Sequence, residues 1–154
     1  MDLSDLLAPG GIFPAFEATS KKQALLDLSA RAGEIVDLDG RLIYDTLLQR
    51  ERLGSTGLGR GIAVPHVKLK GLTDIVCLFA RLTRPIDFES LDGEPVDLIF
   101  LLLAPEHAGG DHLKALARIS RLVREPAALE RLRAAADVAD LKRALTLQPA
   151  PHAA

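Results

Sequence analysis

One histidine of this chain lies in a segment whose pattern is typical of nucleophilic chemistry. His66 directly follows Pro65, and the segment Leu53–Gly61 before it, LGSTGLGRG, holds four glycines in nine residues. Such a segment predicts a loop, and the short apolar piece Ile62–Pro65 predicts a strand end that presents the imidazole. Because a fair fraction of histidine is unprotonated near neutral pH, His66 is a candidate nucleophile.

The glycines before His66 also restrict the kind of site. Gly57, Gly59 and Gly61 alternate, so side chains are sparse there, and we expect a binding loop that another molecule's backbone can approach closely. The loop has neither the P-loop pattern nor the spacing of a dinucleotide site. His107 and His112 bracket a Gly-Gly pair without a further ligand at metal spacing. No metal or cofactor is therefore expected.

Two helices are expected before the glycine loop, and two strands after it. Ser20 and Gln23 form a capping-box pattern that opens a helix over Lys21–Ala32, with Gly33 as its stop. A second helix is expected from about Asp39 to Glu51. The nearly continuous apolar runs over 74–82 and 96–104 are typical of strands covered on both faces.

The last third of the chain has a helical pattern. A helix is expected from Asp111 onward, Pro126 suits the first turn of the next, and Asp137 suits the cap of a last helix ending near Leu147. Residues 148–154 are expected to be a disordered tail. The order of elements predicts an α/β fold: one domain over residues 1–147, with a mixed β-sheet flanked by α-helices on both faces.

Composition excludes several functional classes. The 154 residues are 48% hydrophobic and 26% charged, with a net charge of −2, so a soluble domain is expected and a general nucleic-acid binder is not. The longest apolar run, Leu98–Ala104, is far shorter than the roughly 20 residues of a membrane helix. The N-terminus lacks a secretory signal, and Cys77 is the only cysteine, so the cytoplasm is the expected location.

The segment Gly57–His66, GLGRGIAVPH, resembles the active-site signature of the type-2 enzyme IIA domains of the bacterial phosphotransferase system. That class serves fructose, mannitol and nitrogen regulation, and its pattern is close to G-x-G-x-G-I-A-[IV]-P-H. Arg50-Glu51 and Gly54–Thr56 look especially like the nitrogen-regulatory branch, as does the Ser20–Lys22 helix start. The likeness extends over residues 3–147.

The resemblance implies a phosphotransferase that carries a phosphoryl group on His66, received from an HPr-like carrier and used mainly in regulation. By matching position, it implies that Arg50 and His112 stabilise the phosphate. His112 also follows Asp111 at the start of a predicted helix, where free N–H groups and the helix dipole favour a phosphate. The implied partners downstream are a regulated protein or an enzyme IIB.

Other interpretations of the same residues remain open at this stage. The chain can instead be a sugar-transport enzyme IIA that donates to a separate enzyme IIB, or a regulatory binding module that transfers nothing. Arg50 can be a solvated charge at a helix end, and His112 an ordinary first-turn residue. The motif also departs from its family at Val67, where a small residue is usual. Bulk beside the imidazole is expected to narrow the choice of phosphate donor.

Overall fold

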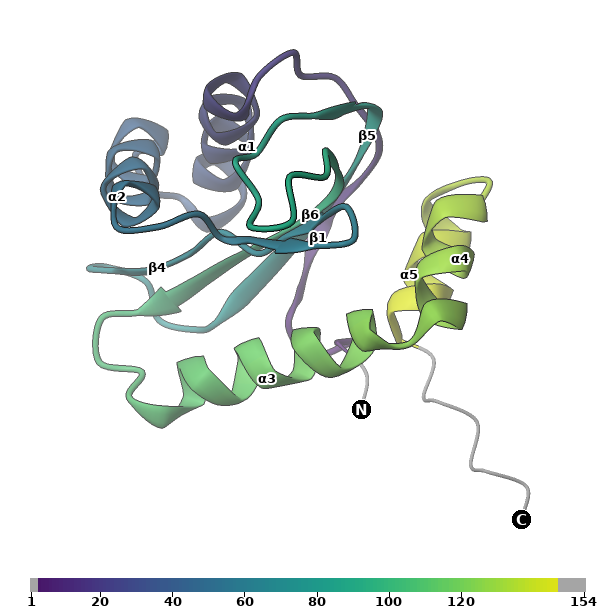
Figure 1. The fold of residues 1–154 in the computed structure, drawn as a ribbon. Coiled ribbons are helices and arrows are strands. Elements are labelled where there is room, and N and C mark those ends of the chain that lie inside the picture. The colour runs from purple at the N-terminus through teal and green to yellow at the C-terminus, as the bar shows by residue number, and fades with distance from the viewer. Residues whose placement is uncertain (1–2, 147–154) are drawn as a thin grey trace.

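A mixed β-sheet runs through the molecule, with helices on both of its faces (Figure 1). The computed structural model describes residues 3–146. The strands are β1 (Leu7–Phe16), β2 (Gly57–Gly59), β3 (Ile62–Ala63), β4 (His66–Leu69), β5 (Val76–Ile86) and β6 (Val96–Pro105). The helices are α1 (Lys21–Val36), α2 (Gly40–Arg52), α3 (Gly110–Arg124), α4 (Pro126–Ala134) and α5 (Val138–Thr146). The predicted fold class is confirmed.

Strand β6 is the centre of the sheet. It pairs antiparallel with β5 on one side and parallel with β3 and β4 on the other. Strand β1 pairs parallel with the far edge of β5, and β2 forms a short antiparallel hairpin with β3. Residues 98–105 of β6 are all buried, as expected for a continuous apolar run covered on both faces.

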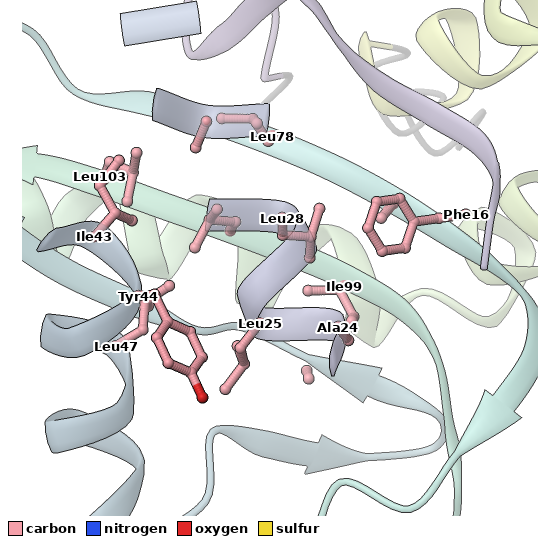
Figure 2. Close-up of a cluster of buried hydrophobic side chains, with 14 of the residues drawn as sticks. Phe16, Ala24, Leu25, Leu28, Ile43, Tyr44, Leu47, Leu78, Ile99 and Leu103 are labelled. Carbon is pink, nitrogen blue, oxygen red and sulfur yellow. The ribbon is translucent and has the colours of Figure 1, made fainter. Parts of the chain in front are cut away.

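Each face of the sheet has its own apolar core. Helices α1 and α2 cover one face, where Leu25, Leu28, Ile43 and Leu47 belong to one buried cluster with Leu103 of the sheet (Figure 2). Helices α3, α4 and α5 cover the other face (Figure 1). There Phe79 and Phe100 meet edge to face with ring centroids 5.0 Å apart. Cys77 lies in the same cluster, and burial raises the pKa of its thiol to about 12, so it is an inert core residue.

The predicted helix starts are confirmed. The Ser20 hydroxyl accepts a hydrogen bond from the Gln23 backbone N–H at 3.1 Å, while the Gln23 side chain turns back to the N–H of Thr19 rather than to that of Ser20. Asp39 caps α2 and Pro126 lies in the first turn of α4. The Asp137 carboxylate accepts from the Asp140 N–H at 2.9 Å. The tail predicted over 148–154 lies outside the described residues.

One helix boundary and one strand differ from the sequence prediction. Gly33 does not stop α1, which continues to Val36 and ends where Asp37 adopts the left-handed conformation (φ 57°). A Cβ at Gly33 would lie 2.7 Å from the Leu38 carbonyl oxygen, so this glycine allows the chain entering α2 to pass close to α1. Strand β1 was not expected, because prolines and glycines interrupt its apolar residues. Its irregular register at the sheet edge tolerates them.

The glycine loop is partly strand, and His66 begins a strand rather than ending one. The pairs Ile62–Leu98, Ala63–Ile99 and His66–Leu102 share one register, so β3 and β4 are one parallel strand interrupted at Val64 and Pro65. The carbonyl oxygens of Gly61 and Pro65 accept from backbone N–H groups of β6 at 3.1 and 2.9 Å. The polar groups of Val64, between them, therefore face away from β6.

Val67 does not crowd the imidazole, contrary to the expectation from the sequence. Successive side chains of a strand point to opposite faces, and Val67 lies in the core under α1 and α2 with only 6% of its surface exposed. It pairs with Leu103 of β6. Its function is to pack the core, so it gives no reason for a narrower choice of donor.

We expect Val67→Gly to lower the free energy of unfolding by about 2–4 kcal/mol. The substitution removes a buried isopropyl group and adds backbone freedom to a strand. The matched control is Lys68→Gly, next to it on the exposed face, which should cost only about 0.5–1 kcal/mol. Urea denaturation of both variants measures the difference, and equal losses would contradict the packing assignment.

Candidate functional site

His66 is held by a hydrogen bond within its own strand segment. Its Nδ1 lies 2.7 Å from the carbonyl oxygen of Val64, the group that the interrupted strand turns away from β6. A carbonyl oxygen can only accept, so Nδ1 carries the proton. In the neutral imidazole Nε2 then keeps its lone pair. The half-buried ring is thus fixed in the tautomer in which Nε2 has the lone pair.

His112 lies beside His66 on the α3 face of the sheet. The two ring centroids are 5.4 Å apart, with the rings tilted by 46°. One imidazole comes from an edge strand and the other from the first turn of α3, so the packing of that helix on the sheet sets their separation. His112 is 9% exposed, and its Nε2 has no hydrogen-bond partner among the described residues.

The surroundings of His112 favour its neutral form. Its pKa is lowered, first because burial disfavours the charged imidazole and then because His66 and Lys68 add positive charge nearby. The helix start behind it has no side-chain cap, and the Asp111 N–H bonds to the carbonyl oxygen of Ala108 at 3.2 Å. The Asp111 N–H, one of the helix-start donors expected to bind a phosphate, is therefore already hydrogen-bonded within the chain.

The guanidinium of Arg50 is hydrogen-bonded to a turn rather than to either imidazole. It is in the last turn of α2, and its guanidinium donates to the carbonyl oxygen of Gly54 at 3.0 Å. No hydrogen bond joins it to His66 or His112 within residues 3–146. The structure brings the two predicted histidines together, while the hydrogen bond of Arg50 holds the turn that leads into β2.

The three alternating glycines are packed against this chain itself. A Cβ at Gly57 would lie 2.2 Å from the Ser90 hydroxyl, and one at Gly59 would lie 2.8 Å from the Asp92 carboxylate. At Gly61 it would lie 2.5 Å from the guanidinium of Arg133. Gly59 and Gly61 also have positive φ angles of 94° and 84°. The hairpin needs glycine here for its own packing and conformation.

Sequence reasoning missed a buried polar group at the base of this hairpin. One carboxylate oxygen of Glu51 accepts both the backbone N–H and the hydroxyl of Thr56, at 3.1 and 3.0 Å. The ammonium of Lys21 lies 3.1 Å from the same oxygen. The sequence pattern marked Lys21 and Glu51 only as helix ends, and a glutamate at a helix end is ordinarily solvated.

The fold and the histidine pair agree with a family of phosphotransferase components. Residues 5–147 match the family model described as "Phosphoenolpyruvate-dependent sugar phosphotransferase system, EIIA 2". The chain belongs to this family, which confirms the resemblance inferred from the glycine–histidine motif. Within residues 3–146 there is no helix with the length and apolarity needed to cross a membrane.

The relatives point to the nitrogen-regulatory branch of that family. A nitrogen regulatory protein of Bradyrhizobium diazoefficiens is 55% identical over 153 residues, 99% of this chain and 100% of the relative. The crystal structure of nitrogen regulatory protein IIA-Ntr from Neisseria meningitidis superposes with a TM-score of 0.88 at 32% identity, covering 94% and 99% of the two chains. Enzyme IIA for mannitol from Escherichia coli, in complex with phosphorylated enzyme IIB, has a TM-score of 0.77 at 20% identity over 91% and 98%, and shows the shared fold alone.

Protonation of His112 should lower the stability of the protein in mild acid. Its pKa is lower in the folded state than in the unfolded chain, so the unfolded chain binds the proton first as pH falls through about 6.5. The free energy of unfolding should therefore decrease from pH 7 to pH 5, and His112→Gln should remove part of that decrease. Urea denaturation at each pH measures it. If His112→Gln changes the pH dependence no more than His107→Gln at an exposed site, the assignment is wrong.

Proposed function

We propose that this protein is a phosphohistidine carrier of a nitrogen-type phosphotransferase system, phosphorylated on Nε2 of His66. The hydrogen bond from Nδ1 to the Val64 carbonyl carries the proposal, because it directs the lone pair to the other nitrogen. The family membership and the nitrogen regulatory relatives support it. An HPr-like phosphocarrier is the proposed donor, and the cytoplasm the proposed location.

The transfer is an exchange of one P–N bond for another. Nε2 of His66 attacks the phosphorus of the donor's phosphohistidine in line, the P–N bond to the donor breaks, and the donor imidazole keeps the electron pair of that bond. Such a transfer needs positioning and charge neutralisation more than bond-making groups. No metal or cofactor enters the proposal.

His112 is the proposed stabiliser of the phosphate. In the free protein it is kept neutral by burial and by its positive neighbours. An anionic phosphoryl group on His66 places a negative charge beside His112 in place of a positive one. This change favours the protonated form of the His112 imidazole. The Nε2 atom, which has no partner among residues 3–146, then becomes available as a charged donor to a phosphate oxygen.

The proposed output of the cycle is regulation, in which phosphorylated and free forms bind a downstream protein differently. The names of the relatives support this direction. Donation to a separate enzyme IIB is the alternative, since a fold neighbour was solved with phosphorylated enzyme IIB. Incubating the phosphorylated protein with an enzyme IIB distinguishes them, because transport donors lose their phosphate to it.

Phosphoenolpyruvate, enzyme I and an HPr-type carrier should add one phosphate to the protein. Intact-mass analysis should show a single addition that is lost in acid, as expected for a phosphohistidine. His66→Ala should abolish it, and His107→Ala should not, since His107 is an exposed histidine outside the pair. Phosphate that persists on the His66→Ala protein would show that the acceptor is a different residue.

His112→Ala and Arg50→Ala should both slow phosphorylation, on the order of 100-fold, if each neutralises charge in the transition state. Rapid-quench measurement of the rate, with circular dichroism to show an intact fold, tests each residue separately. Arg50→Lys separates two functions, because lysine retains the charge and loses the bidentate geometry. A wild-type rate in either alanine variant removes that residue from the transfer mechanism.

A further inference from the structure

The buried carboxylate of Glu51 is connected to His66 through a continuous series of hydrogen bonds. Glu51 accepts both donors of Thr56, the Thr56 carbonyl accepts the Val64 N–H at 3.0 Å, and the Val64 carbonyl accepts Nδ1 of His66 at 2.7 Å. The series joins the end of α2 to the nucleophile through two short segments of the hairpin.

The Glu51 carboxylate that begins this series is buried and paired with a lysine. The Glu51 side chain is 4% exposed, and its partner Lys21, from the first turn of α1, is 14% exposed. The Lys21 ammonium also lies 4.8 Å from the centre of the Phe88 ring. A buried charge that lost its partner would be costly, so the geometry of this pair is strongly determined.

The hairpin is attached to the same neighbourhood at a second place. The hydroxyl of Ser55 donates to the Phe88 carbonyl at 2.8 Å and accepts from the Gly57 N–H at 3.0 Å. Residues 55–57 are therefore fixed on both sides of Thr56. The position of the Thr56 carbonyl follows from these contacts, and its bond to the Val64 N–H places the residue whose carbonyl accepts from His66.

We infer that Glu51 is a positioning residue for phosphoryl transfer, which with Lys21 and Thr56 holds the Val64 carbonyl where it selects the Nδ1–H tautomer of His66. This inference rests on the proposed function for its kinetic consequence. Its structural consequence, the tautomer of His66, is measurable without any phosphate. Because Val64 is bonded to both Thr56 and His66, a substitution of Glu51 should change the tautomer of His66 although Glu51 and His66 are not in contact.

The test compares Glu51→Gln with the wild-type protein by nitrogen NMR of the histidine rings. Glutamine keeps the shape of the side chain and loses the charge that holds Lys21 and Thr56. In the wild type, Nδ1 of His66 should show the shift of a protonated nitrogen and Nε2 that of an unprotonated one. In Glu51→Gln the two shifts should move toward each other, and the phosphorylation rate should fall on the order of 10- to 100-fold, as expected for a displaced nucleophile.

Two controls separate positioning from general stability. Glu89→Gln removes the other carboxylate near Lys21, which is 75% exposed and bonds to Lys21 at 3.4 Å, and should leave both readouts at wild-type values. Leu141→Ala, on the buried face of α5, should lower stability and leave the His66 shifts unchanged. Thr56→Val removes the hydroxyl, one of the two donors to Glu51, and should change the nitrogen shifts of His66 in the same direction by a smaller amount. This variant is the test if Glu51→Gln does not fold.

The outcomes are distinct. A folded Glu51→Gln protein with wild-type His66 shifts overturns the inference, whatever its rate of phosphorylation. If Glu51→Gln does not fold, wild-type shifts in Thr56→Val overturn it. If the wild-type protein accepts no phosphate from any HPr-type donor, the proposed function fails, while the nitrogen shifts still decide whether Glu51 sets the tautomer of His66.

Discussion

The placement of His66 depends first on the alternation of backbone polar groups along the strand that borders β6. Because Gly61 and Pro65 are bonded to β6, the carbonyl of Val64 must point the other way. That carbonyl accepts from Nδ1 of His66. The same pairing that builds the sheet edge therefore sets the direction of the acceptor for Nδ1, and we infer that the contacts of Glu51 and Thr56 hold it in position.

The second imidazole depends on packing rather than on pairing. His112 is placed by α3, whose buried residues Ala115 and Ile119 belong to the core that also contains Phe100 and Leu102 of β6. One histidine is thus fixed by backbone hydrogen bonds and the other by apolar contacts against the same central strand. Rigid elements on a shared scaffold hold a pair of side chains more precisely than loops do.

Residue patterns predicted the elements whose signals are local. The Ser20 cap and the apolar run of β6 needed only neighbouring residues to be recognised. Strand β1 was missed because its apolar residues are interrupted by prolines and glycines that only an irregular edge tolerates. The motif located His66, but its tautomer depends on a pairing with β6 that lies some 36 residues further along the chain, as His66 and Leu102 show. The connection of Glu51 to Thr56 is likewise visible only once α2 and the hairpin are placed.

The bond between His66 and Val64 has a consequence for the solubility of the protein. An edge strand normally offers free N–H and C=O groups on which a strand of another molecule can add, which leads to aggregation. Here the Val64 N–H is taken by Thr56 and its carbonyl by the imidazole, while Pro65 has no N–H to offer. The exposed Lys68 follows on β4, a charge typical of protected edges. The edge that carries His66 is thereby a poor template for the addition of a strand from another molecule.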